Sequence, residues 1–230
     1  MLNKQSLNGF GPIQAIFFDM DGVIYDSMGN HSEAWSKAFA HLGWDFPLEQ
    51  VYLNEGRTGS STIHLLFREK LGREATEEEI RMIYSKKTEL FDKMVKPKPL
   101  PGISALMEKA KANGLEIWVV TGSGQELLLE ELCSDFSGLV QKGRIISGRD
   151  VKNCKPHPEP YLTALARSGF QADRVIVIEN APLGIEAAKS AGIFTIAINT
   201  GILKDEILWQ SGADAVVKEV HQVEGLIFSK

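Results

Sequence analysis

The feature that most constrains this sequence is a short apolar run that stops at two carboxylates. Residues 15–18 are all apolar, and Asp19 and Asp21 follow almost at once. A run of this kind predicts a strand buried on both faces, which is typical of a parallel sheet covered by helices. Such sheets bind their ligands beyond the carboxyl ends of the strands, so we expect both carboxylates at a binding site.

The spacing of Asp19 and Asp21 suits a metal ion. Residues two apart in an extended chain point the same way and lie roughly 6.5 Å apart, so the two charges need a cation beside them. Hard oxygen ligands favour Mg²⁺, which brings phosphate oxygens as further ligands. The alternative for this tripeptide alone is a solvated turn that Gly22 closes.

Length and composition set outer bounds on the fold. A chain of 230 residues can bury one large core and a smaller lobe. With 43% hydrophobic and 24% charged residues, the chain has an ordinary globular composition. The net charge of −5 argues against a nucleic-acid partner. No apolar run approaches the roughly 20 residues that span a bilayer, so we expect no membrane partner.

The first twelve residues and the two cysteines indicate a cellular compartment for the protein. Residues 1–12 have no apolar signal core, and we interpret them as a polar leader to the first strand. Cys133 and Cys154 lack the spacing of a metal site, and two cysteines make no disulfide framework. We therefore predict a cytoplasmic protein with free thiols.

Residues 28–96 are predicted to form an all-helical cap domain. Helical periodicity extends over residues 28–43, 60–71 and 76–94, and Thr76 with Glu79 makes a capping-box pattern. His31 falls on the apolar face of the first helix, where it is either a packed or a functional residue. Residues 22–27 and the proline-rich segment 96–102 are the expected linkers, which permit hinge closure.

The rest of the chain alternates helices with apolar strands. Strands are expected at residues 115–120, 145–146, 174–178, 195–199 and 215–217, with helical segments between them. This alternation predicts an α/β fold with a doubly wound parallel sheet. The predicted core domain comprises residues 1–27 and 97–230, with the cap inserted after the first strand.

Polar residues follow or separate these strands. They are Thr121, Gly122 and Ser123, then Lys155, then Glu179 and Asn180. Together with Asp19 they suit phosphoryl transfer: a carboxylate attacks phosphorus, hydroxyls and backbone N–H groups cradle its oxygens, and a lysine neutralises charge. Taken singly, they also fit a turn, a solvated lysine and a helix cap. The ordered set favours the catalytic interpretation.

The segments DMDGVIYDS, TGS, a lysine before a proline, and IEN resemble the four motifs of the haloacid dehalogenase superfamily. The resemblance covers the chain from about residue 13, and the helical insert is placed as in the first cap class of that superfamily. Within it, the chain is most similar to the β-phosphoglucomutase-like branch, including the inorganic pyrophosphatases of that branch.

The resemblance implies a role for each motif residue. Asp19 would be the nucleophile, and Asp21 would protonate the leaving group, activate water and offer its backbone carbonyl to Mg²⁺. Thr121, Gly122 and Ser123 would hold the phosphate, Lys155 would neutralise it, and Glu179 with Asn180 would complete the metal site. An acid at position 21 favours phosphate chemistry over dehalogenation, because the leaving group needs a proton.

Two departures from the branch guide the choice of substrate. Asn180 stands where a second acidic residue is usual, and Glu55 in the cap segment NEGRTGSS is a candidate replacement metal ligand. Only Arg57 remains of the basic residues with which the cap of sugar phosphomutases binds a second phosphate. These departures favour a Mg²⁺-dependent phosphohydrolase that uses an aspartyl-phosphate and acts on inorganic pyrophosphate.

Two alternatives stay open. One is a β-phosphoglucomutase that interconverts β-glucose 1-phosphate and glucose 6-phosphate, in which His31 would position Asp21 on cap closure. The other is a non-catalytic phosphate-binding regulator. In each case we expect a small phosphorylated ligand and a monomer or small homo-oligomer.

Overall fold

The computed structural model describes residues 12–228, so the predicted polar leader, apart from Pro12, lies outside the described residues. Six parallel strands form one sheet in the order β3-β2-β1-β4-β5-β6. This confirms the predicted doubly wound α/β fold. The strands are β1 (Ala15–Phe18), β2 (Glu116–Val120), β3 (Ile145–Ile146), β4 (Val175–Glu179), β5 (Phe194–Ile198) and β6 (Ala215–Val217).

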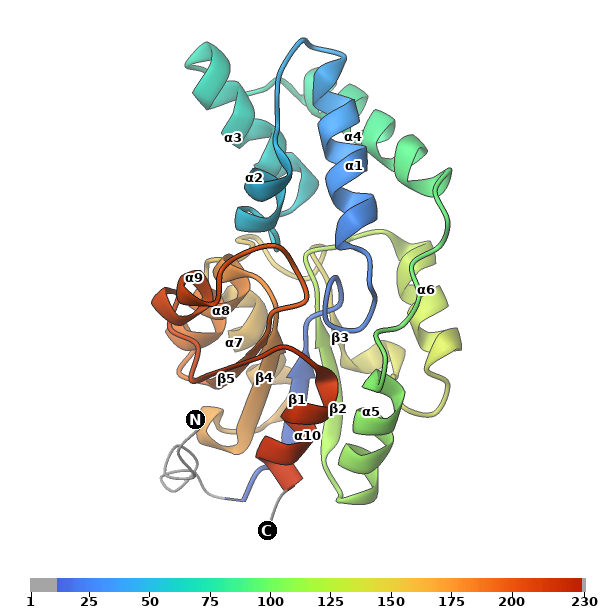
Figure 1. The fold of residues 1–230 in the computed structure, drawn as a ribbon, viewed down its shortest axis with the longest axis vertical. Helices are drawn as coiled ribbons and strands as arrows, with labels where there is room; N and C mark the ends of the chain where they lie inside the picture. The colour runs from blue at the N-terminus through green and yellow to red at the C-terminus, as the bar shows by residue number, and fades with distance from the viewer. Residues whose placement is uncertain (1–11, 229–230) are drawn as a thin grey trace.

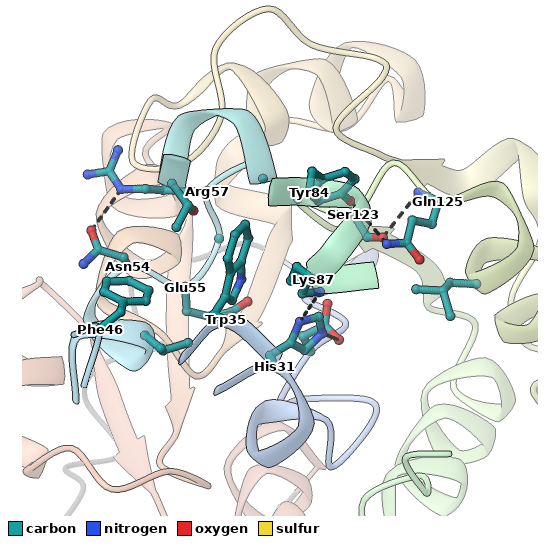
Figure 2. Close-up of a pocket in the computed structure, with 17 residues that line it drawn as sticks. His31, Trp35, Phe46, Asn54, Glu55, Arg57, Tyr84, Lys87, Ser123 and Gln125 are labelled. Carbon is teal, nitrogen blue, oxygen red and sulfur yellow. Dashed lines mark hydrogen bonds and ion pairs between the residues drawn. The ribbon is translucent and has the colours of Figure 1, made fainter. Parts of the chain in front are cut away.

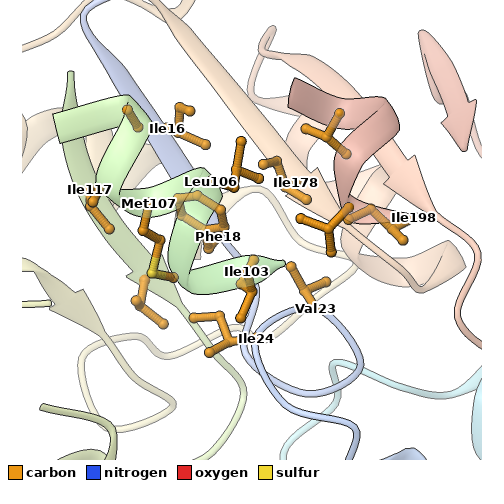
Figure 3. Packing of buried hydrophobic residues seen from close by; sticks show 14 of the residues in the cluster. Ile16, Phe18, Val23, Ile24, Ile103, Leu106, Met107, Ile117, Ile178 and Ile198 are labelled. Carbon is orange, nitrogen blue, oxygen red and sulfur yellow. The ribbon is translucent and has the colours of Figure 1, made fainter. Parts of the chain in front are cut away.

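Helices cover both faces of this sheet (Figure 1). Side chains alternate along β1: Ile16 and Phe18 join the cluster under α5, α6 and α10, whereas Phe17 packs with α7 and α8. Figure 3 shows the first of these clusters around Phe18. The core helices are α5 (Ile103–Ala112), α6 (Glu126–Asp135), α7 (Glu159–Ser168), α8 (Pro182–Ser190), α9 (Asp205–Gln210) and α10 (Val220–Phe228), with short 3₁₀ turns η2 (Lys142–Arg144) and η3 (Ala172–Arg174).

The segment between β1 and α5 forms a helical cap at one end of the molecule (Figure 1). Its helices are α1 (Met28–Ala40), α2 (Leu48–Leu53), α3 (Gly59–Leu71) and α4 (Glu77–Asp92). They share a hydrophobic cluster that contains Trp35, Phe39 and Phe67. The two linkers touch each other, because Tyr25 bridges to Pro99. The predicted capping box of Thr76 and Glu79 is present at the start of α4.

Two helices were not predicted from the sequence. Helix α2 has six residues and follows Pro47, and so short a segment shows little periodicity. Helix α10 contains Gly225, which disfavours helix, and Val220 and Val223 stabilise it by packing on the sheet. Among residues 12–228, no helix has the length and apolar character needed to span a membrane.

Candidate active site

The sheet topology brings the motif residues to one edge. Strand β1 lies between β2 and β4, in register from Ala15 to Phe18, so Asp19 emerges beside the ends of both neighbours. The Asp19 N–H donates to the Ile178 carbonyl of β4 at 2.9 Å. Because parallel strands end at the same edge, residues from positions 19, 121 and 179 meet there although they are far apart in the chain.

Lys155 lies at the centre of this group. Its Nζ donates to Asp19 Oδ1 at 2.5 Å, to Glu179 Oε1 at 2.6 Å and to the Val120 carbonyl at 3.0 Å. The lysine is buried, with 1% of its surface exposed. Although burial lowers it, the two carboxylates raise the pKa of Lys155 well above its usual value. Lys155 therefore stays charged.

Glu179 is fully engaged by these neighbours. Its Oε1 accepts from Lys155 and, at 2.8 Å, from the Tyr161 hydroxyl, while its Oε2 accepts from the Asn180 N–H at 3.0 Å. These contacts favour a role in holding Lys155. The metal role predicted for Glu179 stays a prediction.

Two buried oxygens at the site accept no hydrogen bond from any of residues 12–228. They are Asp19 Oδ2 and Asn180 Oδ1, from the ends of adjacent strands β1 and β4. Burial, with the nearby Glu179 and Asp21 carboxylates, raises the pKa of Asp19 to about 8 despite the opposing charge of Lys155. A carboxylate in that environment calls for a second cation.

A Mg²⁺ ion fits this donor set. Hard oxygen atoms are its preferred ligands. Two such atoms, Asp19 Oδ2 and Asn180 Oδ1, have no hydrogen-bond partner among residues 12–228. No three His, Cys, Asp or Glu side chains within residues 12–228 form a metal-binding group by themselves. The fit therefore depends on the Asn180 amide and on backbone or water oxygens.

Asp21 is held from the cap as well as from the core. His31 Nε2 lies 3.0 Å from Asp21 Oδ1, and the Ser27 hydroxyl donates to the same oxygen at 2.7 Å. Burial raises the pKa of Asp21, but His31 and Ser27 lower it to about 2 overall. Asp21 is therefore a carboxylate near neutral pH.

Lys87 of α4 fixes the state of His31. Its Nζ lies 3.0 Å from His31 Nδ1, and a charged lysine ammonium can only donate a hydrogen bond, so Nδ1 is the acceptor. Burial and the Lys87 charge lower the pKa of His31, which is therefore neutral and carries its proton on Nε2. Lys87 and His31 of the cap are in contact (Figure 2), and His31 in turn contacts Asp21 of the core.

The loop after β2 contains Thr121, Gly122 and Ser123, and the phosphate-holding role predicted for them stays a prediction. Thr121 Oγ1 accepts from the Ser123 N–H at 3.0 Å, which bends Gly122 into a tight turn. The cap loop rests on this turn: a Cβ at Gly122 would lie 2.9 Å from the Gly56 carbonyl oxygen. Gly56 itself has a φ of +91°, and a Cβ there would lie 2.9 Å from Lys155 Cδ. Glycines at both positions permit the cap to approach Lys155.

A cavity of about 60 Å³ lies between cap and core. Its walls include Asp21, Ser123 and Gln125 of the core with His31, Glu55 and Lys87 of the cap (Figure 2). Burial and the nearby Asp21 and Asp19 carboxylates raise the pKa of Glu55 well above its usual value. Glu55 of the cap therefore lies close enough to Asp19 and Asp21 for their charges to affect its pKa.

Arg57 also lines the cavity, but its guanidinium extends toward Asn54 and away from Lys87 in Figure 2. Its Nε donates to Asn54 Oδ1 at 3.1 Å. The substrate contact predicted for Arg57 stays a prediction.

Sequence reasoning missed the roles of Lys87, Ser27 and Tyr161. Lys87 had a detectable signal, because it occupies an apolar position of α4, four residues after buried Ile83. Ser27 and Tyr161 had none, since the contact of Ser27 with Asp21 depends on how the loop after β1 turns, and Tyr161 contacts Glu179, which only the tertiary fold brings near.

Three comparisons relate this chain to known proteins. A family model described as haloacid dehalogenase-like hydrolase matches residues 16–198. A solved structure from Bacteroides vulgatus, provisionally assigned as a beta-phosphoglucomutase, is 43% identical and superposes with a TM-score of 0.92, covering 97% of this chain and 96% of that one. This similarity includes both core and cap.

More distant relatives also have phosphate chemistry in their names. The phosphorylated carbohydrates phosphatase of Thermotoga maritima is 29% identical over 208 residues, covering 90% of this chain and 94% of the relative. CbbY from Rhodobacter sphaeroides, solved in complex with phosphate, is 26% identical with a TM-score of 0.69, covering 90% of this chain and 94% of that one.

Proposed function

The chain belongs to the haloacid dehalogenase-like hydrolase family and is a phosphoryl-transfer enzyme, and we propose that it is a Mg²⁺-dependent phosphohydrolase whose substrate is inorganic pyrophosphate. The single observation that carries the reaction type is the environment of Asp19. One of its oxygens accepts a hydrogen bond from Lys155, and the other is buried with no partner in the part of the chain that the structure describes.

In the first half-reaction, an Asp19 oxygen attacks one phosphorus of pyrophosphate. A new O–P bond forms to Asp19, the bridging P–O bond breaks, and inorganic phosphate leaves. Lys155 and the hydroxyls of Thr121 and Ser123 neutralise and orient the transferring group. Mg²⁺, when bound by Asp19 and Asn180, supplies further positive charge for the phosphoryl oxygens.

In the second half-reaction, Asp21 takes a proton from water as the water attacks the aspartyl-phosphate. The second phosphate leaves and Asp19 is restored as a carboxylate. The hydrogen bonds from His31 and Ser27 keep Asp21 ionised and oriented for this step. A phosphate leaving group suits a low-pKa Asp21, because phosphate needs less protonation than a sugar alkoxide.

The size and charge of the cavity support pyrophosphate over a sugar phosphate. A volume of about 60 Å³ is small, because one water needs roughly 10–15 Å³ by a comparable measure. Glu55 in its wall disfavours a second, unshielded phosphate but suits a substrate that arrives with its metal ion. Lys87 offers the cap-side positive charge for the leaving phosphate.

Turnover of pyrophosphate, β-glucose 1-phosphate and a panel of phosphate esters, with and without Mg²⁺, tests this function. We expect pyrophosphate to have the highest kcat/KM, Mg²⁺ to be required, and the Asp19→Asn variant to be inactive. Glu55→Gln should lower activity on pyrophosphate more than on other esters. Preference for a sugar phosphate would contradict the assignment.

A second candidate is a β-phosphoglucomutase, which the contact between His31 of the cap and Asp21 of the core favours. Such an enzyme excludes water from its phospho-aspartate until the cap closes. The same panel distinguishes the two, because a mutase converts β-glucose 1-phosphate to glucose 6-phosphate without releasing phosphate.

A further inference from the structure

The loop after strand β5 contacts the loop after β1. Thr200 of this β5–α9 loop (residues 199–204) donates from its Oγ1 to the Gly22 carbonyl at 2.6 Å. Gly22 directly follows Asp21 and is buried. Neither Thr200 nor Gly201 is among the described residues that line the catalytic cavity. Thr200 therefore acts on the site through the backbone that it holds.

Hydrogen bonds within the core fix the shape of the β5–α9 loop. The Asn199 N–H donates to the Val217 carbonyl of β6 at 2.8 Å. The buried side chain of Asn199 closes the loop, because its Nδ2 donates to the Leu203 carbonyl at 2.8 Å and to Asp205 Oδ1. Thr200 follows Asn199 directly, so its hydroxyl is presented from a backbone that these hydrogen bonds make rigid.

The cap also contacts this loop. A Cβ at Gly201 would lie 2.4 Å from Cε1 of Tyr52, so the Tyr52 ring of α2 lies directly against the Gly201 backbone. Tyr52 precedes Glu55, a wall residue of the catalytic cavity, by three positions. Two adjacent residues of one loop thus contact the cap, at Gly201, and the loop after β1, at Thr200.

Two hydrogen bonds hold the backbone of Gly22. Its N–H donates to the Tyr25 carbonyl at 2.8 Å, and its carbonyl accepts from Thr200. Because peptide groups are planar, these bonds orient the peptide planes on both sides of Gly22, including the plane that contains the Asp21 carbonyl. Gly22 also packs closely on Asn180, since an added Cβ would lie 2.1 Å from Asn180 Nδ2. A shift of Gly22 would therefore move the Asn180 amide as well.

We propose that Thr200 is a positioning residue for the metal site. By holding the Gly22 carbonyl, its hydroxyl keeps the Asp21 carbonyl and the Asn180 amide in place to bind Mg²⁺. The inference rests on the proposed Mg²⁺ dependence, but it does not depend on which phosphorylated substrate is turned over. Groups that orient metal ligands typically change metal affinity roughly 10- to 100-fold when they are removed.

The test is calorimetric titration of Mg²⁺ into the full chain without substrate. The test variant Thr200→Val removes the hydroxyl and keeps the shape of the side chain, whereas the rescue variant Thr200→Ser keeps the hydroxyl. The matched control is Thr195→Val near the start of β5, which removes a hydroxyl that donates to the Ile193 carbonyl at 3.2 Å. Thermal unfolding of each variant in EDTA measures the loss of stability separately.

We expect Thr200→Val to bind Mg²⁺ about tenfold more weakly than wild type, and Thr200→Ser and Thr195→Val to bind it with wild-type affinity. The Mg²⁺ concentration that gives half-maximal activity should rise in Thr200→Val alone. Equal Mg²⁺ affinity of wild type and Thr200→Val, an equal loss in Thr195→Val, or a failure of Thr200→Ser to restore the affinity would overturn the inference.

The same titration separates this inference from the proposed function. A wild type that binds no Mg²⁺ would overturn both. Preference for a substrate other than pyrophosphate would contradict the proposed substrate alone, because these affinities are measured without substrate.

Discussion

His31 Nε2 lies 3.0 Å from Asp21 Oδ1, although His31 belongs to cap helix α1 and Asp21 to the loop after core strand β1. The contact makes the orientation of Asp21 depend on the position of the cap. The Lys87 ammonium donates to the other ring nitrogen, Nδ1. The neutral imidazole therefore carries its proton on Nε2, which donates to Asp21.

We therefore predict that His31→Ala lowers kcat roughly 10- to 100-fold, because Asp21 loses the donor that orients it for proton transfer. KM should change less, since Thr121, Ser123 and Lys155 are untouched. Steady-state kinetics on pyrophosphate measures both. Lys37→Ala, on the exposed face of the same helix, is the control, and an unchanged kcat in His31→Ala would show that the contact is only structural.

The buried charge of Lys87, which contacts His31, should lower the free energy of unfolding. Burial lowers the pKa of Lys87 from 10.5 to about 8, although Asp21 and Glu55 oppose this. Between these two values the unfolded chain binds more protons than the folded one, so the penalty is complete below pH 8 and disappears as the pH approaches 10.5. Replacement by an apolar side chain removes the penalty.

Lys87→Met is thus expected to be more stable than wild type at pH 7 by roughly 1–3 kcal/mol, while its activity falls. Urea denaturation of both proteins at pH 7 and pH 10 measures the difference, which should shrink at the higher pH. A stability difference that is independent of pH would show that Lys87 titrates normally.

Lys155 has the opposite effect on stability. Its removal leaves the Asp19 and Glu179 carboxylates buried within the site with no lysine between them. Lys155→Met should be inactive and less stable at pH 7 by about 3–5 kcal/mol, the usual result of breaking a buried pair. Denaturation curves measure this, and adding Glu179→Gln should restore part of the stability.

The matched control for Lys155 is Tyr161→Phe, which removes a single hydrogen bond to Glu179. It should cost about 1 kcal/mol and keep most of the activity. If Lys155→Met were no less stable than this control, the charge of Lys155 would not be what compensates the two carboxylates.

The sheet and the motif residues were predictable because each depends on local pattern. Apolar runs such as residues 15–18 are long enough to indicate strands, and parallel strands necessarily end at one edge, which brings Asp19 near Lys155. The fold was confirmed on that basis. Helix α2 was not predictable, since six residues after a proline show no clear period.

The finer contacts depend on packing between segments that are far apart in the chain. His31 was recognised as a residue on an apolar face, and its contact with Asp21 was predicted only for the mutase alternative, because that contact requires the cap to lie against the core. Glu179 was assigned to the metal from its motif, whereas the structure turns both its oxygens toward donors that include Lys155 and the distant Tyr161. Spacing in the sequence carries no information on such rotamers.

Gly22, in the loop after β1, lies against the side-chain amide of Asn180. Its φ is +82°, and a Cβ there would lie 2.1 Å from Asn180 Nδ2. Gly22→Ala should therefore displace the Asn180 amide and also strain the backbone by about 1–2 kcal/mol. Since Asn180 Oδ1 is a proposed Mg²⁺ ligand, the Mg²⁺ concentration that gives half-maximal activity should rise.

Titration of activity with Mg²⁺, together with thermal unfolding in EDTA, separates the two effects of Gly22→Ala. Gly29→Ala is the control, because an added Cβ at Gly29 meets nothing within 4 Å and alanine favours the helix there. We expect the control to keep the wild-type Mg²⁺ requirement. If Gly22→Ala lost stability but kept that requirement as well, Asn180 would not hold the metal, and the free oxygen of Asp19 would need a different second ligand.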